Sequence, residues 1–363
     1  MAWLKRSEEG YCLLHNCKLS PRRVREKCTN PHRAGCTNGK KMQSFISNKK
    51  GDEYKIMGLL VMLIGVSGCG KSSFARDFSE GYDDTEVFSS DAIRKEVFGD
   101  ENDQTHNNEV FSILHKRIIS SLKKGKVCIY DATNLNRKRR MTFLHSISDI
   151  PCEKFCAVFA TPFEICIERD HKRERSVGAE VIRRQISQFQ LPIKEEGWDS
   201  IKFLYEKDKS IYKNLLDYIP KEEVPHDCPP LHLESIQSHL RRVLIEACKE
   251  RADWAMLLAA RYHDIGKFYT KSFWNSKTKT NGEKAHYYGH ENWSAYLVLS
   301  SYDCATAGEL TGAYFYAVEL IALHMELYKK DSPILEVLSK DELEDLKLLK
   351  KYDILGSMRG EIR

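Results

Sequence analysis

The chain has 363 residues, a formal net charge of +5 and twelve cysteines. This length exceeds one ordinary hydrophobic core and predicts two domains. The longest apolar run, 56–66, is too short to span a bilayer, and the charged residues that follow the first six exclude a signal-peptide core, so we expect a cytoplasmic protein with no membrane contact and mostly reduced or metal-bound thiols. The small positive charge permits a nucleic-acid partner without requiring one.

Residues 1–50 form a basic arm rich in cysteine and histidine. A short segment with few core residues needs a metal or a similar staple to fold, which makes its thiols candidate Zn²⁺ ligands. The four candidates are Cys12, Cys17, Cys28 and Cys36. Their spacing is irregular and contains no CxxC pair, so scattered thiols in a flexible arm are an equal alternative.

Two further segments differ in their periodicity. Residues 54–218 alternate strand-like and helical runs, which predicts an α/β domain with a parallel sheet. Its strand-like runs are 56–66, 86–90, 127–130 and 155–160. The proline-rich segment 219–230 breaks both periodicities and is the predicted boundary. Nearly every pattern in 231–363 is helical, which predicts an all-α domain.

A glycine-rich loop follows the first predicted strand. Residues 65–72 read Gly-Val-Ser-Gly-Cys-Gly-Lys-Ser and fit the GxxxxGK[ST] phosphate-binding loop, or P-loop, in the strand-to-helix context that this motif needs. Lys71 would reach the β/γ oxygens of ATP, and Ser72 and Asp131 would serve Mg²⁺. The predicted ATP and Mg²⁺ ligands are Gly65, Ser67, Gly68, Gly70, Lys71, Ser72, Ser73 and Asp131. The alternative is a glycine turn that binds no nucleotide.

Charged residues follow the second and fourth strands, where α/β sheets place their ligands. Asp91 and Arg94 suit deprotonation of an acceptor hydroxyl and capture of an anion. Alternatively, Asp91 caps a surface helix and Arg94 is solvated. Arg169 and Arg173 are four residues apart, so we expect them to share a helix face as phosphate clamps in a lid. An ordinary charged helix face is the alternative.

Together these motifs resemble the phage-type branch of the 5′-polynucleotide kinases, over about residues 54–199. The resemblance implies that Asp91 is the general base, with Lys71 and the lid arginines Arg169 and Arg173 completing the catalytic set. Arg94, Asn134 and Arg139 are the implied contacts to the acceptor strand. Relatives in the same broad group phosphorylate small molecules, so the motifs specify phosphoryl transfer to a hydroxyl more firmly than they specify nucleic acid.

The helical segment contains His263-Asp264, a pair that can ligate one cation through nitrogen and oxygen. With histidines and an aspartate on flanking helices, it resembles the HD phosphohydrolase superfamily, from about residue 231 to the C-terminus. The implied metal ligands are His239, His263, Asp264 and Asp353, with His290 and His324 for a second ion. Such mixed ligands suit Mn²⁺, Fe²⁺, Ni²⁺ or Co²⁺ better than Mg²⁺ and would activate water against a phosphoester. The alternative is buried histidines that only hydrogen-bond helices.

A kinase and a phosphohydrolase on one chain suggest nucleic-acid end healing, because many broken RNAs carry ends that a ligase cannot use. We therefore expect a 5′-hydroxyl kinase joined to a phosphatase or phosphodiesterase for 3′-phosphate, 2′-phosphate or 2′,3′-cyclic phosphate ends. RNA is a better expected substrate than DNA, and a separate ligase is the expected partner. One alternative is a nucleoside or nucleotide kinase with an HD nucleotide phosphohydrolase. Another is an RNA-binding regulator with a non-catalytic HD scaffold.

Overall fold

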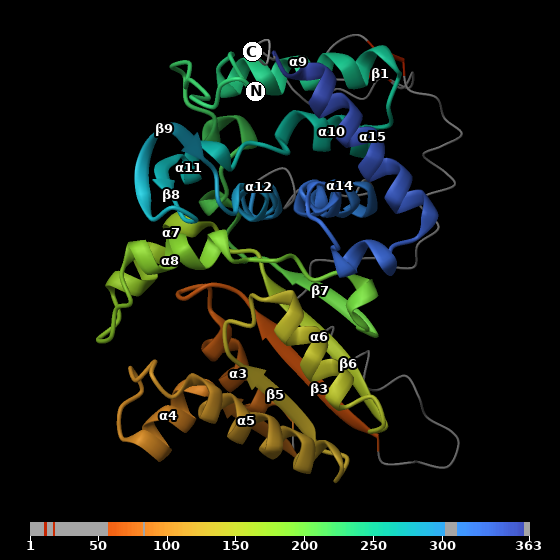
Figure 1. Cartoon of the computed structure of the whole chain (residues 1–363). Helices are drawn as coiled ribbons and strands as arrows, with labels where there is room; N and C mark the ends of the chain where they lie inside the picture. The colour runs from red at the N-terminus through yellow and green to blue at the C-terminus, as the bar shows by residue number, and fades with distance from the viewer. Residues whose placement is uncertain (1–10, 13–16, 19–56, 83, 302–310, 359–363) are drawn as a thin grey trace. The chain divides into compact units, whose positions relative to one another are not determined.

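A computed structural model describes residues 11–12, 17–18, 57–82, 84–301 and 311–358 (Figure 1). These residues divide into two compact units, and the division falls between Ile211 and Tyr212. No helix among them is long and apolar enough to cross a membrane. The segment 219–230, predicted as a boundary from its prolines, belongs to the second unit, and so do residues 212–218, which we expected in the first. The side-chain amide of Gln237 binds segment 219–230 by donating to the carbonyl oxygens of Pro220 (3.1 Å) and Glu222 (2.6 Å).

Most of the basic arm lies outside the described residues, including Cys28 and Cys36. Its described part consists of strands β1 (Tyr11–Cys12) and β2 (Cys17–Lys18). They pair antiparallel with the backbone of Cys12 opposite that of Cys17. The zinc site therefore stays a prediction.

The first unit is built on a five-stranded parallel sheet in the order β4-β5-β3-β6-β7. The strands are β3 (Gly58–Ile64), β4 (Thr85–Ser89), β5 (Val127–Asp131), β6 (Cys152–Phe159) and β7 (Ser200–Leu204). The continuous apolar run of β3 occupies the centre, where a parallel strand is buried on both faces. The predicted parallel α/β class is confirmed. The fifth strand, β7, was not predicted, because its half-buried residues form only a short edge strand.

Helices connect these strands, and several begin at a side-chain cap. Ser89 accepts a hydrogen bond from Ala92 N (3.4 Å), and Asn136 accepts one from Arg139 N (3.0 Å). The cap of the helix that carries Asp91 is therefore Ser89, which places Asp91 in the first turn. The helices are α3 (Lys71–Glu80), α4 (Ser90–Phe98), α5 (Asn107–Leu122), α6 (Arg137–Ser146), α7 (Phe163–His171) and α8 (Ala179–Ser187), with 3₁₀ turns η1 (Lys194–Glu196) and η2 (Lys209–Ile211).

A buried carboxylate joins α6 to the turn η1. Glu196 accepts two hydrogen bonds from Arg140 (2.6 and 2.7 Å), one from Arg137 (3.3 Å) and one from the Trp198 indole (3.2 Å). Arg140 also donates to the carbonyl oxygens of Asn134 and Leu135, both at 3.0 Å. This network therefore fixes the loop after β5, whose first residues belong to the candidate site.

Substitution of Glu196 by alanine is expected to destabilise the first unit strongly. The side chains of Arg140 and Glu196 are 1% and 0% exposed, so the variant leaves buried guanidinium groups without their carboxylate. Breaking such a pair costs about 3–5 kcal/mol. The unfolding temperature measured by circular dichroism should fall by several degrees, whereas substitution of the exposed Glu153 should leave it unchanged. An equal effect of the two variants would contradict this assignment.

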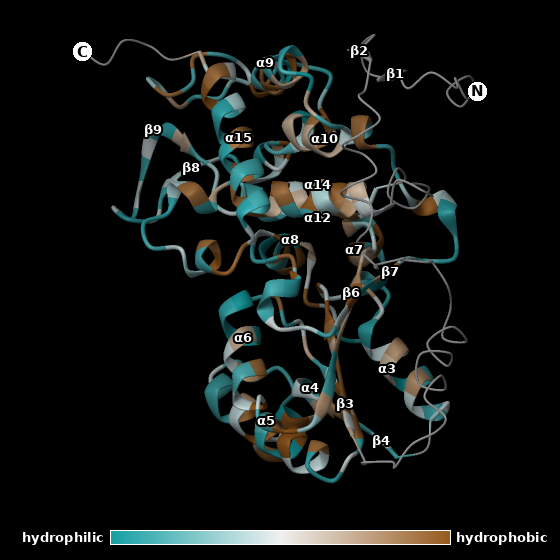
Figure 2. Ribbon diagram, turned by 90° about the vertical axis from the view of Figure 1, so that its right-hand side faces the viewer, coloured by the Kyte–Doolittle hydropathy of each residue, from teal (hydrophilic) through white to brown (hydrophobic). Residues whose placement is uncertain are grey.

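The second unit is mainly helical. Its helices are α9 (Ile236–Lys249), α10 (Trp254–Tyr262), α11 (Lys267–Thr270), α12 (His290–Leu299), α14 (Thr311–Leu323) and α15 (Lys340–Gly356), with 3₁₀ turns η3 (Leu215–Tyr218), η5 (Glu326–Tyr328) and η6 (Pro333–Glu336). Figure 2 shows brown, apolar stretches along α14. This helix packs between α10 and α12, and α15 packs on α9. A helix that is apolar around its circumference belongs in a core.

One hairpin departs from the expected all-α composition. Strands β8 (Ser272–Asn275) and β9 (Thr280–His286) pair antiparallel between α11 and α12. Their residues are mostly exposed and polar, so they carry no apolar alternation that would mark strands in the sequence.

Candidate functional site

The predicted phosphate loop lies between β3 and α3, as its motif requires. Gly68 and Gly70 have positive φ angles of 81° and 99°, which side chains rarely adopt. A Cβ atom at Gly68 would also lie 2.2 Å from the carbonyl oxygen of Cys166 in α7. Lys71 opens α3, and its ammonium group donates to the carbonyl oxygen of Val66 at 2.7 Å. The loop backbone is therefore shaped to present N–H groups at a helix N-terminus, where anions bind.

Asp131 ends β5 beside this loop. Burial raises the pKa of its carboxyl group, and the Lys71 charge and a hydrogen bond from the Ser72 side chain lower it. The charge of Asp91 raises it further, and that of Arg173 lowers it. The structure thus brings the predicted lysine, hydroxyl and two carboxylates close together. A lysine, a hydroxyl and a carboxylate at a loop of this kind are the groups that hold nucleotide phosphates and Mg²⁺.

Asp91 lies at the start of α4 with half of its side chain exposed. Its Oδ1 is 2.6 Å from Arg94, and its Oδ2 is 3.5 Å from Arg175. Arg94 is buried and also donates to the side-chain oxygen of Asn107 at 2.7 Å. The guanidinium of Arg94 is therefore not solvated, and its two partners fix it beside the carboxylate.

The two predicted lid arginines occupy different kinds of position. Arg169 lies in α7 and donates to Glu206 at 2.7 Å. One of its guanidinium nitrogens lies near Gly70, 3.9 Å from the point that a Cβ atom added to this glycine would occupy. Arg173 follows the end of α7 at His171, so the expectation of one shared helix face is wrong. Asp170 explains the turn, because it accepts hydrogen bonds from the N–H groups of Val177 and Gly178. Arg173 is exposed there.

The predicted acceptor contacts Asn134 and Arg139 lie after β5. The Asn134 amide donates to the Leu63 carbonyl oxygen at 2.9 Å, so it also ties this loop to β3, and Arg139 is exposed on α6. Sequence patterns missed Gln185 of α8. Its side-chain oxygen accepts from Ser67 N (2.7 Å), and its amide donates to the Ser67 hydroxyl (3.0 Å). No motif marks this glutamine, because only folding brings α8 onto the loop.

In the second unit, the six predicted metal ligands form two groups that share Asp264. Its Oδ2 lies 3.3 Å from His239 Nε2 and 3.4 Å from His263 Nε2, and its Oδ1 lies 3.1 Å from His290 Nε2 and 3.5 Å from His324 Nε2. Asp353 Oδ1 lies 3.1 Å from His239 Nε2 and 3.7 Å from His263 Nε2. Within each of the two groups, the ligand atoms lie close enough together to hold one metal ion. The groups share the carboxylate of Asp264, and each group uses a different oxygen of it.

Local structure positions these ligands. His239 lies within α9, His290 opens α12, His324 follows α14, and Asp353 lies in the last turns of α15. Gly266 allows the turn after α10 to approach α12, because a Cβ there would lie 2.1 Å from the carbonyl oxygen of His290. The requirement for glycine at this position follows from that contact.

The histidine rings are oriented as metal ligands usually are. The Nδ1 atoms of His263, His290 and His324 lie 3.2, 2.7 and 2.7 Å from backbone carbonyl oxygens. A carbonyl only accepts, so each Nδ1 carries hydrogen and each Nε2 faces the carboxylates. These three buried Nε2 atoms and Asp264 Oδ1 find no hydrogen-bond partner within the described ranges. Burial lowers the pKa of His324, which favours the neutral ring. Its Nε2 then carries a lone pair that points at Asp264 Oδ1. A cation between them satisfies both, and the residues fit a metal centre.

Metal uptake at this centre is expected to release protons. Burial alone would lower the pKa of His239, but the neighbouring carboxylates of Asp264, Asp353 and Glu234 raise it to about 10. Below that pH the metal-free ring stays charged, and a metal requires it neutral. Apparent affinity for Mn²⁺ should therefore rise about tenfold per pH unit for each released proton between pH 6 and 9. Titration calorimetry in buffers of different ionisation enthalpy measures the protons, and uptake without proton release would contradict the assignment.

Sequence patterns missed a second group beside this centre. His226 is fully buried, lies in the segment expected to be a boundary, and stacks on His232. Lys267 links the groups, because its ammonium lies 3.1 Å from His226 Nε2 and 2.5 Å from Asp264 Oδ2. Glu234 Oε1 lies 3.4 Å from His239 Nδ1, the position of a carboxylate that orients a metal-bound histidine.

One comparison with known proteins falls within the first unit. Residues 60–192 match a family described as an AAA domain. No curated protein matches the chain. The chain is similar to a component of the Pnkp1/Rnl/Hen1 RNA repair complex, at 24% identity and TM-score 0.35, covering 39% of this chain and 47% of that one. A second structure of the Pnkp1/Rnl/Hen1 complex is 27% identical with a TM-score of 0.29, covering 33% of this chain and 42% of that one.

The chain is also similar to a gluconokinase from Sinorhizobium meliloti 1021, at 17% identity and a TM-score of 0.30. This match covers 44% of this chain and 89% of the gluconokinase chain. The chain spans about half the length of the RNA repair component that it matches. The parallel sheet and the loop geometry define the first unit as a P-loop domain of the α/β class, and most of it matches the AAA-domain family. Such a domain implies ATP and Mg²⁺ as its ligands.

Proposed function

We propose that this chain is a bifunctional enzyme that heals nucleic-acid ends, with an ATP-dependent 5′-hydroxyl kinase in the first unit and a metal-dependent phosphohydrolase of the HD type in the second. RNA is the proposed substrate. One observation carries the hydrolase half: Asp264 presents one oxygen to each of two histidine groups whose Nε2 atoms are buried and unpartnered among the described residues. A scaffold without a metal would leave these buried polar atoms without compensation.

In the kinase half, Asp91 would accept the proton of the attacking hydroxyl, because it lies at the strand edge beside Asp131 and the phosphate loop. Lys71 would hold the β- and γ-phosphates, and Ser72 with Asp131 would hold Mg²⁺. Arg169, adjacent to Gly70, would stabilise charge on the transferred phosphoryl group, and Arg94 would bind the acceptor strand.

In the hydrolase half, His239, His263, Asp264 and Asp353 would hold one ion, and Asp264, His290 and His324 a second. Bound ions would supply an activated water and neutralise the phosphate charge. Lys267 adds a cation directly beside Asp264, where a phosphate oxygen would approach. Asp264 would contribute one oxygen to each ion, and the backbone carbonyls that accept from Nδ1 of His263, His290 and His324 fix the direction of these rings.

The test presents the purified protein with ATP and either a 5′-hydroxyl RNA oligonucleotide or a free nucleoside. In parallel, RNA ending in a 3′-phosphate or a 2′,3′-cyclic phosphate is incubated with Mn²⁺. We expect label transfer to the oligonucleotide and metal-dependent removal or opening of the terminal phosphate. Transfer to the nucleoside alone would favour a nucleotide-metabolism enzyme. Binding of RNA without either reaction would favour an RNA-binding regulator.

A further inference from the structure

The hairpin β8–β9 exposes an unusual set of side chains. Phe273 and Trp274 are 42% and 44% exposed, and Tyr288, just beyond β9, is 47% exposed. An irregularity in strand pairing between Ser272 and Trp274 explains why two consecutive aromatics both face solvent. Regular pleating would have turned one of them to the opposite face.

The same hairpin is basic. Lys277, Lys279 and Lys284 are exposed, and the residues from 271 to 288 contain one carboxylate, Glu283. Tyr288 is held against the turn, because its hydroxyl oxygen accepts from Ser276 N at 3.1 Å and its ring stacks on His286 at 5.5 Å. Exposed aromatic rings interleaved with ammonium groups are suited to bind single-stranded nucleic acid, because the rings can stack on bases and the ammonium groups can contact phosphates.

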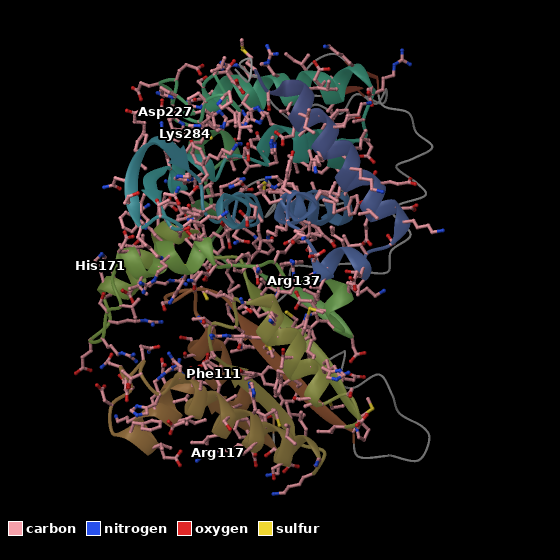
Figure 3. The ribbon with its side chains drawn as sticks, viewed as in Figure 1. Phe111, Arg117, Arg137, His171, Asp227 and Lys284 are labelled. Carbon is pink, nitrogen blue, oxygen red and sulfur yellow. The ribbon has the colours of Figure 1, made fainter. Side chains whose placement is uncertain are left out.

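The base of the hairpin is hydrogen-bonded to Asp227, close to the candidate metal centre. Ala285 N donates to the carbonyl oxygen of Asp227 at 2.7 Å, and Lys271 donates to the Asp227 carboxylate at 2.7 Å. Asp227 follows His226, which contacts Lys267, and Tyr288 precedes the ligand His290 by two residues. Figure 3 labels Asp227 and Lys284 near each other, in the part of the second unit that carries the label β9 in Figure 1.

We propose that the hairpin β8–β9 is a binding surface for single-stranded nucleic acid, on which bases stack against Phe273, Trp274 and Tyr288 while Lys277, Lys279 and Lys284 contact the phosphates. It would deliver a strand end to the metal centre of the same unit. This inference rests on the proposed function and adds the surface that holds the strand leading to the cleaved end. A base-stacking surface predicts tolerance of sequence and dependence on salt.

The test uses the full chain with Mn²⁺ and a fluorescein-labelled single-stranded RNA 12-mer that ends in a 3′-phosphate. The double variant Phe273→Ala/Trp274→Ala should weaken binding, measured by anisotropy, about tenfold, and should raise KM for phosphate release without lowering kcat. Lys277→Glu/Lys279→Glu should weaken binding and flatten its dependence on salt. Lys347→Glu, an exposed charge reversal on α15, is the matched control and should change neither.

Hydrolysis of p-nitrophenyl phosphate reports on the metal centre alone and should be equal in all variants. If both hairpin variants hydrolyse RNA ends like the wild type, with unchanged affinity and KM, the hairpin inference alone is overturned. A protein partner would then be the remaining candidate to bind the hairpin. Wild-type hydrolysis of p-nitrophenyl phosphate without action on any RNA end would instead overturn the proposed function. If Phe273→Ala/Trp274→Ala loses hydrolysis of p-nitrophenyl phosphate, it has disturbed the metal centre. In that case the result for Lys277→Glu/Lys279→Glu decides whether the hairpin binds RNA.

Discussion

Substitution of Asp264 by alanine is expected to remove both proposed metal ions and to abolish the proposed release of phosphate from RNA ends. Both ligand groups depend on this carboxylate, at distances of 3.1–3.5 Å from the four Nε2 atoms. Metal ions supply several kcal/mol of transition-state stabilisation, so the rate should fall on the order of 10³-fold or more. Elemental analysis of the purified variant and a phosphate-release assay measure the two effects.

Two further variants separate the ions. Asp353→Asn should impair the first ion only, because Asp353 contacts His239 and His263. His324→Ala should impair the second only, and it should reduce the rate strongly only where two ions act together. Lys71→Ala is the control and should retain full hydrolysis. Wild-type protein with no bound ion, and no hydrolysis with any added divalent metal, would reduce this unit to a scaffold.

Substitution of Lys71 or Asp91 by alanine is expected to abolish transfer of the ATP γ-phosphate to a 5′-hydroxyl end. Loss of one preorganised charge-stabilising group costs about 10²–10³-fold, and loss of a general base about 10²–10⁴-fold. Transfer of radiolabel from ATP to an oligonucleotide measures both. Arg94→Ala should mainly raise KM for the acceptor, since a phosphate clamp acts in the ground state as well.

Asp264→Ala supplies the reciprocal control and should retain kinase activity. Binding of ATP by the Asp91→Ala variant should also be unchanged, because Asp91 lies on α4 and outside the phosphate loop. A wild-type transfer rate in Asp91→Ala would refute its role as base and would reduce its contact with Arg94 to a structural ion pair.

The sequence by itself determined the P-loop domain. The loop 65–72 lies directly after a buried strand, and glycines with positive φ together with a lysine at a helix start admit few other structures. The resemblance to the HD superfamily also implied six residues that the fold brings together in two groups sharing Asp264. Motifs of this kind are readable because their chemistry demands particular residue types at short range or on successive helices.

Only the tertiary structure decided the rest. Gln185, Glu234 and His226 contact the candidate sites through packing between elements far apart in the chain, so no local pattern marks them. Arg173 leaves its expected helix because Asp170 accepts backbone N–H groups beyond it. The exposed hairpin was equally hidden, because a two-stranded ribbon held at its base by Asp227 needs no apolar alternation of its own.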